Sequence, residues 1–187
     1  MMRWIVVCSI GLLGCRPLPA PEVGDPDSLP WRVCLDDALI DQFGEDAVRG
    51  GLDGWEAVAP VDLFDVTGPC GDDGAPFRIA AGSLAEGPID NRIERGRATI
   101  TLDPSSGGFR VVDEGTCTGG ADVATSIGHE VGHWLGLDDS CTPDTVCADR
   151  PRLESIMYWT RPACEVSTPN DFDRDTLAGR WGFEEEG

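Results

Sequence analysis

Lysine is absent from this 187-residue sequence, so all 14 basic residues are arginine, and they face 34 acidic residues. The formal net charge of −20 argues against nucleic acid as a partner, because phosphate binding requires clustered cations. The same charge argues against docking on an anionic membrane surface. The acidity by itself favours solubility and names no partner.

The N-terminal apolar run, residues 4–13, is too short to span a bilayer, which takes about 20 residues. It follows Arg3 and has the length of the hydrophobic part of a signal peptide. The run ends in the residues LLGC, with Cys15 last, and these resemble the lipobox of bacterial lipoproteins. The resemblance implies cleavage before Cys15 and lipidation of its thiol. An ordinary secretory signal with an incidental cysteine is the alternative.

These features divide the chain into three parts. We expect a lipoprotein signal peptide over residues 1–14, and a lipidated cysteine with a proline-rich tether over residues 15–30. Proline at this density favours an extended chain, which would reach about 45 Å at roughly 3.1 Å per residue. Residues 31–187 are enough for one globular domain. We therefore expect an exported protein of the bacterial cell envelope, which meets the membrane only through its N-terminal lipid anchor.

Six cysteines lie in the domain, and an even number in an exported chain suggests up to three disulfides. They are Cys34, Cys70, Cys117, Cys141, Cys147 and Cys164. The absence of a CxxC pair argues against a cysteine-based metal site. Six cysteines allow fifteen connectivities. A pair within one irregular stretch, Cys141–Cys147, is one hypothesis, and elimination then leaves Cys34–Cys70 and Cys117–Cys164.

The hydrophobic pattern predicts an α+β domain, with a small mixed twisted β-sheet packed on two helices. One helix is expected over residues 34–55, and a second opens after Gly119 and Gly120 and ends at Gly136. A last helix is expected over residues 169–181, with Thr168 as its N-cap and Pro169 as its first residue. The expected strands are residues 62–66, 77–80, 97–102 and 109–112.

Histidine is almost as scarce as lysine, and the only two, His129 and His133, lie in an HExxH motif on a predicted helix. Four residues make just over one turn, so both imidazoles stand on one face and can share a metal. Glu130 can then accept a proton from a catalytic water without being a ligand. Serine or cysteine hydrolase chemistry is disfavoured, because no histidine is left to activate the nucleophile.

The residues after the motif supply a third ligand. Gly136 can adopt a left-handed conformation that ends the helix and turns the chain back. Asp139 would then reach the metal, and Asp138 is the rival ligand.

The stretch HEVGHWLGLDD resembles the HExxHxxGxxH/D signature of metzincin zinc metallopeptidases, and through Ser140 it is most similar to the matrixin branch. Matrixins carry histidine at the position of Asp139, whereas snapalysin-type metzincins carry aspartate. The resemblance implies a metzincin-like catalytic domain that cleaves protein or peptide substrates. It implies one catalytic Zn²⁺ on His129, His133 and Asp139, with Glu130 as general base and acid.

Residues 155–158 (SIMY) resemble the matrixin Met-turn, and residues 168–182 resemble the matrixin C-terminal helix. The resemblance implies that Met157 packs beneath the imidazoles as an apolar platform and does not bind the metal. It also implies that strand 97–102 is the edge strand above the cleft, where a peptide would add by backbone hydrogen bonds.

Calcium is a second candidate metal, for which the oxygen-rich loop residues are Asp72, Asp73, Gly74 and Asp103. A second zinc held by histidine is excluded, because no third histidine exists. We expect a monomeric zinc endopeptidase. The alternatives are a non-catalytic surface lipoprotein that uses the fold to bind a partner, and a structural-zinc domain. A non-catalytic lipoprotein would have no role for Glu130, and a structural zinc site would lack a fourth protein ligand.

Overall fold

The computed structural model describes residues 26–71, 74–94, 96–112, 119–141, 149–158 and 162–183. The helical elements, in chain order, are η1 (Pro26–Ser28), α1 (Asp37–Phe43), α2 (Glu45–Glu56), η2 (Pro104–Ser106), α3 (Val123–Trp134), α4 (Arg150–Leu153) and α5 (Asp171–Trp181). The strands are β1 (Trp31–Leu35), β2 (Phe64–Pro69), β3 (Phe77–Ala81), β4 (Ile89–Glu94), β5 (Arg97–Leu102), β6 (Phe109–Arg110) and β7 (Ala121–Asp122).

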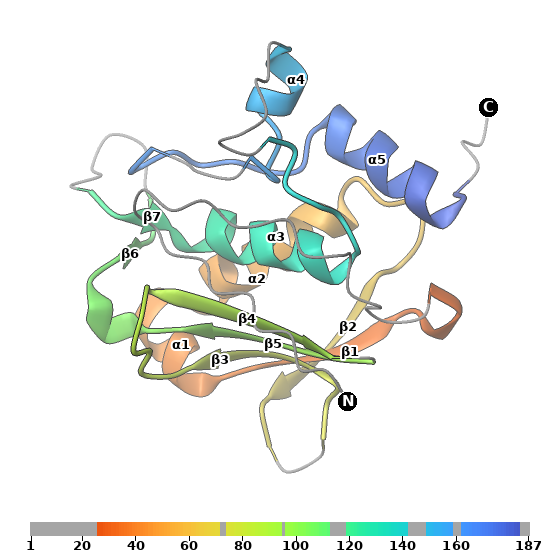
Figure 1. Ribbon diagram of the computed structural model, residues 1–187. Helices are drawn as coiled ribbons and strands as arrows, with labels where there is room; N and C mark the ends of the chain where they lie inside the picture. The colour runs from red at the N-terminus through yellow and green to blue at the C-terminus, as the bar shows by residue number, and fades with distance from the viewer. Residues whose placement is uncertain are drawn as a thin grey trace.

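The main sheet has five strands in the order β2-β1-β3-β5-β4, and β6 and β7 form a separate parallel pair. Strand β1 runs parallel to β2 and β3, and β3 runs parallel to β5. Only β4 is antiparallel to its neighbour β5. Helices α2 and α3 lie on the same side of this sheet (Figure 1), so the predicted α+β class and small mixed sheet are confirmed.

The predicted helix over residues 34–55 is wrong at its start and in its middle. Residues Trp31–Leu35 form β1, which pairs on both sides and is buried at four of its five positions. Only Arg32 of β1 is exposed, and Cys34 on the same face is buried in its disulfide, so the alternation typical of a half-exposed strand stops after Val33. The helical part is split at Gly44, whose φ of 85° ends α1 before α2 begins.

The prediction that residues 97–102 form the edge strand is also wrong. These residues are β5, which lies between β3 and β4. The strand at this edge is β4, for which the sequence pattern predicted no strand. Only Ile89 and Asn91 of its side chains are buried, so the apolar alternation is weak.

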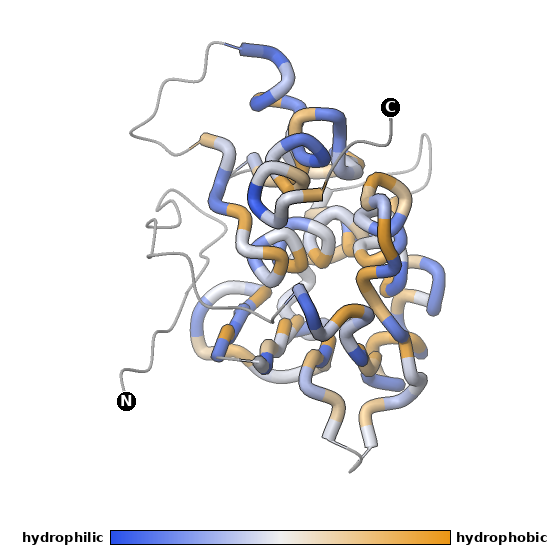
Figure 2. The backbone as a smooth tube through the Cα atoms, turned by 90° about the vertical axis from the view of Figure 1, so that its right-hand side faces the viewer, coloured by the Kyte–Doolittle hydropathy of each residue, from blue (hydrophilic) through white to orange (hydrophobic). Residues whose placement is uncertain are grey.

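Helix α3 is held close to α2 by two glycines and an indole. A Cβ atom on Gly51 would lie 2.6 Å from the backbone nitrogen of Gly128, so only glycine permits this approach. The Trp55 indole N–H donates to the Gly128 carbonyl oxygen over 2.8 Å. Figure 2 shows hydrophobic and hydrophilic stretches alternating along the backbone, and the buried core includes Trp55 of α2 and Ile127 of α3.

The ends of α3 follow local rules. Asp122 is the N-cap, and its carboxylate accepts from the Thr125 N–H. At the other end Gly136 has φ 81°, and its N–H donates to the His133 carbonyl while the Leu137 N–H donates to the Gly132 carbonyl. These two bonds form a Schellman motif, which reverses the chain.

The start of α5 corrects the expected cap. Asn170, rather than Thr168, is the N-cap, and Asp171, rather than Pro169, is the first helical residue. Asn170 and Asp173 form a capping box, in which each side chain accepts from the other residue's N–H.

Cysteine pairing is visible for part of the chain. Cys34 of β1 and Cys70, directly after β2, form a disulfide, which is the pairing expected for these two. Cys141 and Cys164 are also disulfide-bonded. The expected pairs Cys141–Cys147 and Cys117–Cys164 involve Cys117 and Cys147, which lie outside the described residues.

The expected signal peptide and most of the tether, with Cys15, likewise lie outside the described residues. Among the residues that are described, no helix is both long and apolar enough to cross a membrane.

Candidate metal centre

Helix α3 holds both histidines with their Nε2 atoms directed away from the backbone. The Nδ1–H of His129 donates to the Ile156 carbonyl over 2.9 Å, and the Nδ1–H of His133 donates to the Leu137 carbonyl over the same distance. A carbonyl oxygen can only accept, so each ring carries its proton on Nδ1 when neutral. The Nε2 lone pairs are therefore left for another partner, as in metal-binding histidines.

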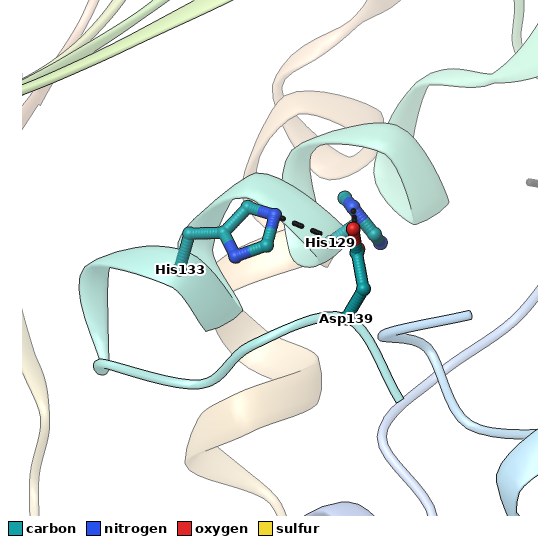
Figure 3. A group of neighbouring side chains, drawn as sticks. All are labelled: His129, His133 and Asp139. Carbon is teal, nitrogen blue, oxygen red and sulfur yellow. Dashed lines mark ion pairs between the residues drawn. The ribbon is translucent and has the colours of Figure 1, made fainter. Parts of the chain in front are cut away.

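Asp139 is the carboxylate that joins the two imidazoles. Its Oδ1 lies 3.3 Å from Nε2 of His129 and 3.8 Å from Nε2 of His133. Figure 3 shows the two rings projecting from α3 and Asp139 reaching them from the segment that follows. The rival ligand Asp138 is exposed and is not part of this group.

The three donor atoms are spaced for a shared metal ion, whereas they make few hydrogen bonds to one another. His133 Nε2 and Asp139 Oδ1 are buried and have no hydrogen-bond partner, an arrangement that is costly without a compensating ligand. One ligand atom from each of the three residues lies within 4.8 Å of the others. Tetrahedral zinc, with bonds of about 2.1 Å, places its ligand atoms roughly 3.4 Å apart. The group could therefore hold a metal ion with little rearrangement.

Nearby carboxylates determine the pKa of His129 when no metal is bound. Burial disfavours the imidazolium, but the contact with Asp139 and the nearby carboxylates of Glu130 and Asp139 outweigh it and raise the pKa of His129 to about 9. Negative charge at this spot favours any cation, whether a proton or a metal ion.

The segment of residues 155–158 packs against α3 next to His133. Met157 is buried, and a Cβ atom on Gly132 would come within 2.1 Å of its sulfur, so the thioether packs against the helix between the two histidines. Its carbonyl accepts from the Ser140 N–H over 2.8 Å, which fixes the residue next to Asp139.

A buried carboxylate on α5 supports this turn. Asp173 accepts hydrogen bonds from the Ser155 hydroxyl and from the Ile156 N–H, the latter over 3.0 Å. The carbonyl of the same residue, Ile156, accepts the hydrogen bond from His129 Nδ1–H. Asp173 was not anticipated from the sequence, although an aspartate three residues after Asn170 is a capping-box signal.

Glu130 is buried beside the cluster and is bound by a residue that the sequence did not reveal. One of its carboxylate oxygens accepts from the Asn91 side-chain amide over 2.9 Å. Asn91 lies on β4, which the sequence pattern had missed, so no local signal pointed to it.

The candidate calcium ligands receive no support as a group. The Asp103 carboxylate accepts from the Ser105 hydroxyl and N–H and from the Leu84 N–H. The Ser105 hydroxyl, followed by the Leu84 N–H, holds the pKa of Asp103 below its ordinary value. Asp103 is therefore a loop cap. Asp72 and Asp73 lie outside the described residues, within which His129, His133 and Asp139 are the one group of three His, Cys, Asp or Glu side chains that could hold a metal ion.

The sequence matches no protein-family model and no curated protein. The argument for a function therefore depends on this chain's own residues and their geometry.

The raised pKa of His129 predicts how metal binding varies with pH. A metal ion needs the neutral imidazole, so below about pH 9 it must displace one proton. We expect the apparent Zn²⁺ affinity, measured by competition with a chromogenic chelator, to fall about tenfold for each pH unit below 9. An affinity that is constant between pH 7 and about 9 would contradict this assignment.

The pH dependence of stability in the metal-free protein gives a second measurement of the His129 imidazole. Folding raises the pKa of His129, so protonation of this imidazole stabilises the folded state. This contribution to the free energy of unfolding is complete below the ordinary pKa of 6.5 and is lost as the pH rises through about 9. The Asp139→Asn variant, which removes one carboxylate, should shift the pH dependence of the free energy of unfolding, measured on the metal-free protein by denaturant titration, to lower pH.

Proposed function

We propose that this chain is a zinc-dependent endopeptidase of the metzincin type. The observation that carries the proposal is the pair of buried ligand atoms on His133 and Asp139 that make no hydrogen bond, with His129 beside them and Glu130 on the same helix as both histidines. Two imidazole nitrogens and one carboxylate oxygen form a donor set that suits Zn²⁺. Three protein ligands leave a coordination position open, which favours catalysis over a purely structural metal.

Bound Zn²⁺ would polarise the scissile carbonyl and lower the pKa of the attacking water. Glu130 would then accept a proton from that water while the water oxygen attacks the carbonyl carbon. The carboxylic acid formed on Glu130 delivers the proton to the leaving nitrogen as the C–N bond breaks. Glu130 thus returns to its starting state, and no covalent intermediate with the protein is required.

The open edge of β4 is the proposed place of the substrate backbone. Within the described sheet, β4 pairs only with β5, so its other side is available to an extended peptide. Strand β4 runs beside α3 in Figure 1, and Asn91 connects the two. Backbone pairing at this edge would present a peptide bond to Glu130 with little dependence on side chains.

The metzincin assignment is supported by features that lie outside the HExxH motif. Gly136 turns the chain back with φ 81°, and the side chain of Met157 packs against Gly132, next to His133. Helix α5 follows and anchors the turn through Asp173. Together with the resemblance at residues 129–140 and 155–158, these features support the proposal.

We further propose that the enzyme works in the bacterial cell envelope, tethered through a lipid on Cys15. The disulfide between Cys34 and Cys70 supports an oxidising compartment. A proline-rich segment between the anchor and the first strand would hold the domain clear of the membrane surface.

Replacing the proposed base tests the enzymatic function. In Glu130→Gln the side chain keeps its size, but it can no longer accept a proton. We expect kcat/KM for an unstructured protein substrate to fall by about 100-fold or more, with bound zinc unchanged. Glu45→Gln, which changes an exposed acid at the start of α2, is the matched control and should cleave like the unmodified protein.

Equal cleavage by the unmodified protein and Glu130→Gln would reject the enzymatic function. Stoichiometric zinc without any cleavage would instead favour the non-catalytic surface lipoprotein.

Replacing Cys15 tests the location. The Cys15→Ser variant cannot be lipidated, so in a bacterial host with lipoprotein processing the protein should leave the detergent-soluble membrane fraction. Metabolic labelling with a fatty-acid analogue should mark the unmodified chain and not the variant. Equal membrane recovery and no label in either would contradict the lipid anchor.

A further inference from the structure

We propose that Asn91 is a positioning residue that fixes the carboxylate of Glu130 relative to the edge strand on which the substrate is aligned. This inference rests on the proposed function, because it assigns a role in the same reaction. Its evidence is separate, since it comes from β4 and not from the metal-binding motif.

Both N–H groups of the Asn91 amide donate hydrogen bonds to Glu130. The Asn91 Nδ2 donates to the Glu130 carboxylate over 2.9 Å and to the Glu130 backbone carbonyl over 3.0 Å. One bond ties the strand to the helix backbone, and the other fixes the direction of the carboxylate. A carboxylate held in this way loses rotational freedom that it would otherwise have in an open cleft.

The orientation of the amide is fixed by a third contact. The Trp134 indole N–H donates to Asn91 Oδ1 over 3.0 Å. An indole can only donate, so the oxygen must face Trp134 and the NH₂ group must face Glu130. The three hydrogen bonds satisfy both N–H donors and the oxygen of a side chain that is only 2% exposed.

The backbone direction of β5 follows from its bonds to the β3 side of the sheet. The Ala98 N–H donates to the Pro76 carbonyl, and the Leu102 carbonyl accepts from the Gly82 N–H. Backbone groups of alternate residues in a strand point to the same side. Ile100 lies between Ala98 and Leu102 at the same spacing, so its N–H and C=O also point toward β3.

Asn91 is the antiparallel partner of Ile100 on β4. Since Ile100 directs its backbone away from β4, the two residues form a non-hydrogen-bonded pair. The Asn91 N–H and C=O therefore point to the outer edge of the sheet, where a peptide would pair. One residue thus offers its backbone to the proposed substrate and its side chain to the proposed base.

The chemical choice of residue supports this role. The flanking residue Ile89, with the same orientation on β4, is apolar and buried, and packing alone would be satisfied by another apolar side chain. A buried amide is favourable only when it is fully hydrogen-bonded. Asn91 connects β4 to a carboxylate whose position matters for proton transfer.

Kinetics of two Asn91 variants separate positioning from a general structural role. Asn91→Asp keeps the acceptor for Trp134 but removes both donors to Glu130, and Asn91→Ala removes the whole amide. We expect kcat to fall roughly 10- to 100-fold in both, with KM and zinc content within about twofold of the unmodified protein. The control Thr125→Val removes a buried hydroxyl from the same helix and should lower the unfolding temperature with kcat unchanged.

A rescue experiment gives a readout that does not depend on activity. In Asn91→Asp two carboxylates face each other, which should lower the unfolding temperature. Adding Glu130→Gln restores a donor and acceptor pair with the direction reversed, so the double variant should recover much of that loss. Independent, additive shifts would show that the two side chains do not interact.

The outcomes distinguish this inference from the function on which it rests. A drop in kcat together with stability rescue supports the positioning role. Unchanged kcat in both Asn91 variants of an active enzyme, or a change confined to KM, overturns it and leaves the endopeptidase function standing. An unmodified protein that binds zinc but does not cleave overturns the proposed function and the positioning role together.

Discussion

The candidate site depends on bringing a carboxylate back to two imidazoles within six residues. His129 and His133 share one face of α3, and the chain must reverse before Asp139 can approach them. The Schellman motif at Gly136 makes this reversal with two backbone hydrogen bonds. A residue with a Cβ atom at φ 81° would be strained and would also meet Arg180, from which the added atom would lie 3.0 Å.

The ligands are held by neighbours that belong to other elements. Each imidazole donates to a backbone carbonyl, and that of His129 donates to Ile156 in the turn of residues 155–158. That turn is bonded to Asp173 of α5, and the residue after Asp139 is bonded to Met157. Segments that are distant in sequence therefore meet at the site. Helix α5, near the C-terminus, helps to position the ligands of residues 129–139. Such outer partners commonly affect a metal site nearly as much as its ligands do.

Local signals explain which parts could be predicted from the sequence. The bounds of β5, the reversal at Gly136 and the approach of Asp139 follow from residue types and spacing within short windows, whereas the place of Met157 was implied only by the resemblance at residues 155–158. The last two residues of β1 were mistaken for helix, because residues 33–35 are buried in succession and Leu35 lies at helical spacing from Leu39. The identity of β1 is decided by pairing with β2 and β3, which are far away in sequence.

Asn91 and the edge position of β4 are harder still to predict. Asn91 gains its meaning only from Glu130, 39 residues away, and from Trp134 one turn further along α3. A polar residue in a polar stretch looks like surface when the sequence alone is considered. The tertiary fold turns it inward, and the strand order then decides which edge is open.

The central claim, that Asp139 completes a zinc site with the two histidines, is tested most directly by zinc stoichiometry. Purified protein would be dialysed against a zinc buffer and measured by elemental analysis, together with Asp139→Ala and the neighbouring control Asp138→Ala. We predict one Zn²⁺ per chain for the unmodified protein and for Asp138→Ala, and a large loss of zinc in Asp139→Ala. Full zinc in Asp139→Ala, or no zinc in the unmodified protein, would contradict the account.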